Sequence, residues 1–402
     1  MKKISTFIIS LFIIHSFFSQ EVKQKKFKTQ LSGELEIDNF NFYKSPFFDQ
    51  QVNTQSSVMV NPALKVRTKQ FELIFEPFVR YDHFDKYRTH FDLRQFSLIV
   101  NHKKWRYTLG INSYTWTRFT GFSLMDIANR IDPYENPLDV AKLGQPATDI
   151  NYLFNENLHV QFSCLPYLRI EKYPDYSSRY LFTPVEISND NINFENHSLK
   201  RWYPSSAIRI NYTYKKTDFA FQLFHGLNRT PLFTYNTQQR VLDQQFVVMN
   251  QTGLEIQHTL KGFILKNEFI IRQQEENTTI GIHPGIEYNF SRLFGSRIEL
   301  QTMVEYLYDK QKKDQGLPFS DHYIGNFRFD FGDLNNTDIF IKLITNRTNY
   351  FSFIDFEFNR RIFNKFKLNL HANFALGNIT PTDPMYLFQY NTFIGGKLSW
   401  FF

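Results

Sequence analysis

Apolar and polar residues alternate along many short stretches of the chain, and this period of two is typical of β-strands. In residues 366–377, Phe366 and Leu368 fall on one face of the predicted strand, whereas Lys367 and Asn369 fall on the other. The same alternation recurs in residues 208–215, 280–290 and 298–306. Many segments of this kind, often with charged residues on the polar face, predict an all-β protein.

The connectors between these segments are alternately short and long. This alternation is typical of transmembrane antiparallel up-and-down β-barrels, which have short periplasmic turns and long extracellular loops. The chain also lacks a linker or a change of composition that would divide it into soluble domains. Counting the segments predicts about 18 strands, with about 16 as the alternative and both termini periplasmic. The longer connectors are residues 44–54, 83–90, 116–147, 172–203, 229–244 and 310–320, and those after Glu275, Asn346 and Gly377 are shorter.

The end of the chain predicts a final strand with one strongly apolar face. A C-terminal aromatic residue in phase with alternating apolar residues resembles the recognition signal of outer-membrane barrels. We therefore expect Phe402 to contact the outer-membrane barrel-assembly machinery. The residues on this face are Tyr386, Phe388, Tyr390, Ile394, Gly396, Leu398, Trp400 and Phe402.

The first twenty residues predict a cleavable signal peptide. Lys2 and Lys3 precede an apolar stretch, residues 4–14, that is shorter than the roughly 20 residues of a transmembrane helix. An N-terminal membrane anchor is the alternative. We therefore expect a signal peptide at residues 1–20 and a single barrel domain at residues 21–402, in the outer membrane of a Gram-negative cell.

The composition agrees with a barrel whose outer face contacts outer-membrane lipid. The chain has 46 Phe and 22 Tyr but a mean hydropathy of only −0.40, as expected when only every second strand residue faces lipid. The net charge of +7 is spread along the chain, which gives no indication of nucleic-acid binding. Cys164 is the only cysteine, so an intrachain disulfide is excluded, and no ligand spacing predicts a metal or another cofactor.

The polar strand faces would line the barrel interior and carry charges of both signs. One interpretation is a network of salt bridges across the lumen, and the alternative is a selectivity track for a polar or anionic solute. The candidate lumen-lining residues are Arg209, Lys266, Glu268, Arg272, Glu287, Arg328, Asp330 and Lys367.

The connector at residues 116–147 differs from the others in length and chemistry. Ser123 and Asp126 predict a capped helical turn, and Asp132-Pro133 and Asn136-Pro137 are turn signals. Connectors of this length are more often functional than passive. We expect this one to fold inward and constrict the lumen. The candidate constriction and ligand-binding residues are Arg106, Trp116, Arg118, Asn129, Asp132, Glu135 and Asp139.

Residues 90–165 resemble a segment of the uncharacterised porin-like barrels related to alginate-export porins. The resemblance is carried by the Trp105–Gly110 strand and the Trp116, Asp132-Pro133 and Leu143-Gly144 positions, with Asn129 and Pro137-Leu138-Asp139 between them. That family has Gly-Arg-Gln at the end of the strand, whereas this chain has Gly110-Ile111-Asn112. The resemblance implies a substrate channel and does not identify the solute.

The sequence thus favours a porin-like channel for a small or oligomeric solute, monomeric or homotrimeric. A non-channel barrel that binds surface polysaccharide or docks a secretion complex is the alternative, and the aromatic residues of 172–203 serve either loop packing or sugar stacking. An outer-membrane lipid hydrolase is disfavoured. The chain has no Gly-x-Ser-x-Gly or His-Glu-x-x-His motif, and only His258 is placed on the lipid face, whereas His283 and His371 face the lumen.

Overall fold

The computed structural model describes residues 27–136, 138, 141–170, 172–195, 198–348, 350–377 and 379–402. Eighteen strands form one antiparallel sheet. They are β1 (Lys28–Phe42), β2 (Thr54–Arg67), β3 (Phe71–Asp82), β4 (His90–His102), β5 (Trp105–Asn112), β8 (Gln145–Asn155), β9 (Leu158–Leu165), β11 (Ser205–Tyr214), β12 (Thr217–Leu227), β15 (Val248–Leu260), β16 (Phe263–Gln274), β17 (Asn277–Phe290), β18 (Glu299–Asp309), β19 (Asp321–Asp330), β20 (Asp338–Asn346), β21 (Ser352–Ile362), β22 (Phe366–Leu376) and β23 (Phe393–Phe401).

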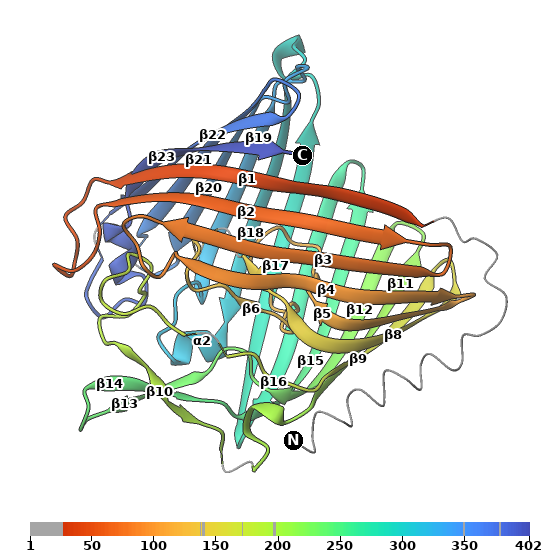
Figure 1. The fold of residues 1–402 in the computed structure, drawn as a ribbon, viewed down its shortest axis with the longest axis horizontal. Coiled ribbons are helices and arrows are strands. Elements are labelled where there is room, and N and C mark those ends of the chain that lie inside the picture. The colour runs from red at the N-terminus through yellow and green to blue at the C-terminus, as the bar shows by residue number, and fades with distance from the viewer. Residues whose placement is uncertain are drawn as a thin grey trace.

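The sheet closes on itself because the first strand pairs with the last. Leu35 of β1 lies opposite Trp400 of β23, and the register continues from Glu34–Phe401 to Phe42–Phe393. Figure 1 shows the resulting barrel, with every strand beside its neighbour in the chain order. The prediction of a closed antiparallel barrel with 18 strands is confirmed, and the alternative of 16 strands is wrong. The predicted signal peptide lies outside the described residues.

Smaller elements lie in the long connectors. The paired strands β6 and β7 belong to the connector between β5 and β8, and β10, β14 and β13 form a three-stranded sheet beyond one end of the barrel wall (Figure 1). The remaining elements of the described residues are one short α-helix and three 3₁₀ turns. Their bounds are β6 (Arg130–Ile131), β7 (Lys142–Leu143), β10 (Ile187–Asn193), β13 (Leu232–Asn236), β14 (Val241–Gln245), α2 (Lys310–Asp314), η1 (Lys200–Trp202), η2 (Leu293–Gly295) and η3 (Tyr386–Tyr390).

The prediction for the last strand is wrong at its beginning. Residues Tyr386–Tyr390 form η3, and the strand starts at Phe393, so the connector after β22 is long and not short. The Asp383 side chain accepts a hydrogen bond from the backbone N–H of Met385, and the adjacent Leu387 and Phe388 are both buried. Two consecutive buried side chains cannot lie on one face of a strand, so packing against the loops selects the turn.

The two faces of the wall have different chemistry, as the alternation predicts. On β17, the side chains of Ile280 and Ile286 are 44% and 43% exposed, whereas that of His283 is 0% exposed. The outward face is therefore an apolar belt of the kind that contacts lipid. Among the described residues, no helix is long and apolar enough to cross a membrane.

The barrel interior contains a packed apolar core in addition to charged side chains. Phe122, Leu124 and Met125 of the connector between β5 and β8 pack with wall residues such as Ile270 of β16 and Ile344 of β20. Trp116 of the same connector packs in a second cluster with residues of β8, β9, β11, β12 and β15. The connector between β5 and β8 thus occupies the lumen.

Candidate functional site

The connector that fills the lumen is residues 113–144, of which 137, 139 and 140 are not described; we call it the inward segment. Three local interactions determine its conformation: a side-chain cap, a turn and a strand pairing. The Ser123 hydroxyl accepts hydrogen bonds from the N–H groups of Met125 and Asp126, but no helix follows this cap. The Asp132 carboxylate accepts from the N–H of Tyr134 and so forms the predicted turn. The third interaction is the pairing of β6 with β7.

Residues 117–124 of the inward segment are held by two buried carboxylates on β15 and β16. Glu268 accepts hydrogen bonds from the hydroxyls of Thr117 (2.6 Å) and Ser123 (2.8 Å) and from the N–H of Leu124 (2.7 Å). Glu255 accepts from the N–H of Arg118 at 2.5 Å and pairs with its guanidinium at 2.9 Å. Hydrogen bonds to buried carboxylates are about twice as strong as neutral ones, so this is a firm anchor.

An aromatic contact completes this anchor. The ring of Phe119 stacks on that of His283, with centroids 3.8 Å apart, and His283 in turn bonds to Glu305 on the neighbouring strand at 2.8 Å. A Cβ added to Gly285 would lie 2.6 Å from the Phe119 ring, and one added to Gly253 would lie 2.3 Å from the sulfur of Met125. Glycine at these two wall positions therefore gives the segment room to approach.

Residues 132–135 of the inward segment are held by side chains of β3 and β4. Asp132 bonds to Arg94 at 2.6 Å and to His90 at 3.2 Å, and Glu135 bonds to Arg80 at 2.9 Å. β3 is the third strand of the ring and β16 the eleventh, so the two anchors stand nearly opposite each other. The inward segment therefore spans the lumen.

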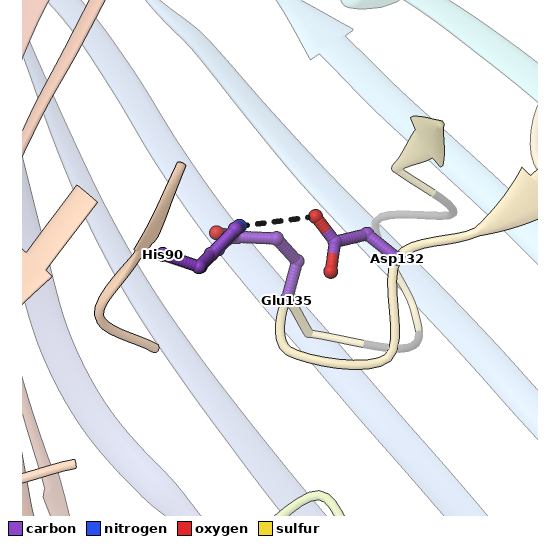
Figure 2. A group of neighbouring side chains, drawn as sticks. All are labelled: His90, Asp132 and Glu135. Atoms are coloured by element: carbon purple, nitrogen blue, oxygen red, sulfur yellow. Dashed lines mark hydrogen bonds and ion pairs between the residues drawn. The ribbon is translucent and has the colours of Figure 1, made fainter. Parts of the chain in front are cut away.

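Figure 2 shows His90 facing Asp132 and Glu135, whose ligand atoms lie within 4.8 Å of one another. Such a group can hold a metal ion, but both carboxylates are already neutralised by Arg94 and Arg80. Burial alone would raise the pKa of Asp132, but the hydrogen bond from His90 and the charge of Arg94 lower it to about 2. These contacts are those of an ion-pair anchor.

Two lysines make further contacts with the inward segment. The ammonium group of Lys342 on β20 donates to the carbonyl of Leu138 at 3.0 Å. Lys142 pairs with Asp126 and donates to the carbonyl of Tyr114. Burial raises the pKa of Asp126 despite its pairing with Lys142. The segment is thus attached to a third part of the wall and to itself.

The structure brings most of the candidate constriction residues together in the inward segment. Trp116 is buried, and its carbonyl accepts from Arg209 on β11. Asn129 bonds to the N–H of Tyr114 and to the carbonyl of Leu143, and so links the two ends of the segment. Arg106 is exposed on β5 and lines a cavity together with Trp116, and Asp139 lies outside the described residues.

The candidate lumen-lining residues fall at two depths. Arg209, Lys266, Glu268 and Arg272 are buried among the inward segment, neighbouring strands and α2. Glu287 pairs with Lys266 at 2.7 Å and is half-buried. Nearer the short turns, Arg328 is exposed, and Asp330 and Lys367 are half-buried.

Sequence reasoning missed several partners of the inward segment. His90, Arg94 and Glu255 were absent from the predicted site, although all three lie on strands. The available signal was a charged residue on the polar face of a strand next to a long connector. That signal cannot pair Arg80 with Glu135, because the two residues are 55 positions apart.

Two cavities lie on either side of the inward segment. The long-loop cavity, of about 290 Å³, is lined by residues 122–135 of the segment and by the long connectors. The short-turn cavity, of about 540 Å³, is lined by Ser113–Trp116, by Arg106 and by the short-turn ends of β4, β5, β8 and β9. The two cavities have no lining residue in common among the described residues.

Comparison with known proteins places the fold. Neither a protein-family model nor a curated protein sequence matches the chain. Solved structures match it over its length. A BenF-like porin from Pseudomonas fluorescens Pf-5 gives a TM-score of 0.56 at 8% identity, covering 94% of this chain and 98% of that one. Wzi of Escherichia coli, described as a carbohydrate-binding β-barrel involved in capsule assembly, gives 0.54 at 9%, covering 94% and 84%.

A third structure, OccK3 of Pseudomonas aeruginosa, gives a TM-score of 0.52 at 9% identity, with 93% of this chain and 96% of that one covered. The chain has the fold of outer-membrane β-barrels. At this identity the likeness concerns the fold alone, and the relationship to alginate-export barrels that residues 90–165 indicated is not shown.

Proposed function

We propose that the protein is a substrate-selective, porin-like channel of the Gram-negative outer membrane. The observation that carries this proposal is the inward segment, which spans the lumen between two cavities and is anchored to nearly opposite walls. A solute that crosses the barrel must pass this segment. A general pore would leave the lumen open, whereas charged and aromatic side chains at a constriction select solutes by size and charge.

The wall supports passage along a defined track. Buried cations and carboxylates on the lumen face are paired with each other or with the inward segment, as in Arg209–Glu255 at 2.6 Å. Paired charges keep a narrow polar path ordered without giving it a strong overall preference for cations or anions. We propose that Arg118 on one side and residues 132–135 on the other form the constriction.

Electrical recording tests the proposal. The full-length protein, inserted into planar lipid bilayers, should give small, discrete conductance steps, and proteoliposomes should admit small solutes but exclude large sugars. Absence of conductance together with absence of solute entry would overturn the channel proposal. Recognition of Phe402 by the assembly machinery stays a prediction.

A second candidate is a binding barrel without a channel. It is favoured by Arg179, whose buried guanidinium donates to the carbonyl of Val52 at 2.6 Å and to the side chain of Asn53 at 2.7 Å, and which also reaches the carbonyl of Tyr390. Three long connectors are thereby joined over one end of the barrel. Solute binding without any conductance would favour this candidate over the channel.

A lipid hydrolase receives less support. On the lipid side, the Thr217 hydroxyl lies 2.8 Å from a ring nitrogen of His258. Nucleophilic catalysis also needs a group that orients the histidine, and among the described residues no carboxylate bonds to His258. The absence of lipid hydrolysis by the purified barrel is the expected result.

A further inference from the structure

The long-loop cavity is lined by four cationic and four acidic side chains. Four carboxylates line it: Asp126, Asp132, Glu135 and Asp309. Each already has a cationic partner, although Arg94 also pairs with Asp92, and Arg80 with Glu36 and Asp38. Asp126 pairs with Lys142, Asp132 with Arg94, Glu135 with Arg80, and Asp309 with Arg272.

Three cations of the cavity remain after these pairs are formed. Arg130 comes from β6 of the inward segment, Arg229 from the connector after β12, and Lys312 from α2. None of the three forms an ion pair with a described residue. Three separate parts of the chain thus bring basic side chains without an ion-pair partner to one cavity, and burial lowers the pKa of one of them, Lys312.

Arg229 is the most unusual of the three. Its side chain is only 5% exposed, and its three guanidinium nitrogens have no hydrogen-bond partner among the described residues. Arg130 is 6% exposed; it donates to the Tyr173 hydroxyl at 3.3 Å, but its Nη1 has no partner. Burial, and then the charge of Arg130, lower the pKa of Arg229 to about 10, so it still carries its charge at neutral pH.

Buried charges without partners are destabilising, and buried polar groups without hydrogen bonds are rare in folded proteins. An anion between Arg229 and Arg130 would supply the missing acceptors. A guanidinium presents two parallel N–H groups, and a carboxylate accepts both. A carboxylate therefore satisfies the unpaired N–H groups of Arg229 and Arg130 better than a neutral molecule does.

The remainder of the cavity is apolar and aromatic. Rings from five different connectors line it, so a ligand with an apolar body would bury that body against them. These rings are Phe122, Tyr173, Phe182, Phe233, Phe319 and Phe388. An inorganic anion has no apolar surface that could pack against these rings. The cavity volume of about 290 Å³ suits a small organic molecule.

We infer that the long-loop cavity binds a small organic carboxylate with an apolar or aromatic body, with its carboxylate at Arg229 and Arg130. The assignment of this ligand as the transported solute rests on the proposed function. The binding site itself does not depend on conductance.

Calorimetric measurement of ligand binding to the full-length protein in detergent tests the inference. The probe is phenylacetate, and 2-phenylethanol has the same carbon skeleton without the charge. Phenylacetate should bind saturably, and 2-phenylethanol and inorganic phosphate at least tenfold more weakly. Arg229→Gln should weaken phenylacetate binding at least tenfold. Arg240→Gln, which changes an exposed arginine outside the cavity, should leave it unchanged.

The same variants give a second readout that does not need a ligand. Because an unpaired buried charge is destabilising, Arg229→Gln should raise the thermal unfolding midpoint of the ligand-free protein, whereas Arg240→Gln should not. Equal phenylacetate binding by wild type and Arg229→Gln, or no binding by wild type, would overturn the inference. Phosphate binding as tight as that of phenylacetate would overturn the organic class. Conductance without phenylacetate binding contradicts this inference alone, and binding without conductance contradicts the channel alone.

Discussion

Replacing Glu268 by Gln removes one charge from the anchor at β16 while keeping the shape of the side chain. The carboxylate now accepts three hydrogen bonds from the inward segment, two from hydroxyls and one from the Leu124 N–H. The Ser123 hydroxyl already accepts from the N–H groups of Met125 and Asp126, so it has to donate to the side chain at position 268. In the variant the amide oxygen can accept from the Thr117 and Ser123 hydroxyls, and the amide nitrogen then faces the Leu124 N–H. Two contacts become hydrogen bonds between neutral groups, and the third is lost.

The expected loss follows from the strength of these bonds. A hydrogen bond to a charged group contributes about 1.5–3 kcal/mol and one between neutral groups about 0.5–1.5 kcal/mol. Two bonds weakened by roughly 1 kcal/mol each, together with one lost bond of about 1.5 kcal/mol, reduce the docking free energy of the inward segment by at least about 3 kcal/mol. Because about 1.4 kcal/mol corresponds to a factor of ten, the ratio of undocked to docked segment should rise about 100-fold.

Single-channel recording and hydrogen exchange measure this change. Glu268→Gln should open to a larger conductance for a greater fraction of the time, and the Leu124 amide should exchange faster. The matched control is Glu287→Gln, on the next strand. Its carboxylate pairs with Lys266, and its side chain is 24% exposed, so its loss should cost less than about 1 kcal/mol.

Unheated gel electrophoresis in SDS verifies that both variants keep the barrel folded. If a folded Glu268→Gln variant matched Glu287→Gln in both conductance and exchange, the anchoring role of Glu268 would be wrong.

The remaining predictions address other contacts of the same fold. Because the pKa of Asp132 is lowered to about 2, its ionised form stabilises docking of the inward segment by about 2 kcal/mol above roughly pH 4. This stabilisation is lost as the pH falls toward 2. Conductance should therefore rise between pH 5 and 2 in the wild type and change less in Asp132→Asn. Gly285→Ala should displace the Phe119 ring from His283 and cost about 1–3 kcal/mol, measured as faster exchange in residues 117–125; an unchanged rate would refute the close approach. Deletion of Phe402 should slow assembly into the outer membrane without changing the fold of protein refolded in detergent, and normal assembly of that variant would refute the signal.

The wall of the barrel was predictable from sequence because the lipid bilayer imposes a local rule. Every second residue of a strand faces lipid, so the alternation of Ile280, Ile282 and Ile286 with Gly281 and His283 is visible without knowledge of the fold. Closure follows because unpaired strand edges are not tolerated in lipid. These features depend on neighbouring residues or on the solvent alone.

The anchors of the inward segment were not predictable in the same way. The Asp132 turn is local and was recognised. Glu268 lies 151 positions from Thr117 and Arg80 lies 55 positions from Glu135, and no periodicity relates such pairs. At Tyr386–Tyr390 the alternation itself was misleading, because packing of Phe388 against the loop residue Phe319 selects a turn over a strand.

The most direct test of the central claim is the conductance of a barrel whose inward segment is shortened. Residues 117–128 are replaced by a short Gly-Ser linker, which removes the anchor at β15 and β16. The control shortens the hairpin between β13 and β14, which lies beyond the barrel wall (Figure 1). If the inward segment restricts passage, only the first variant shows a severalfold larger conductance and admits larger sugars; an unchanged conductance in that variant, with the barrel folded, would contradict the account.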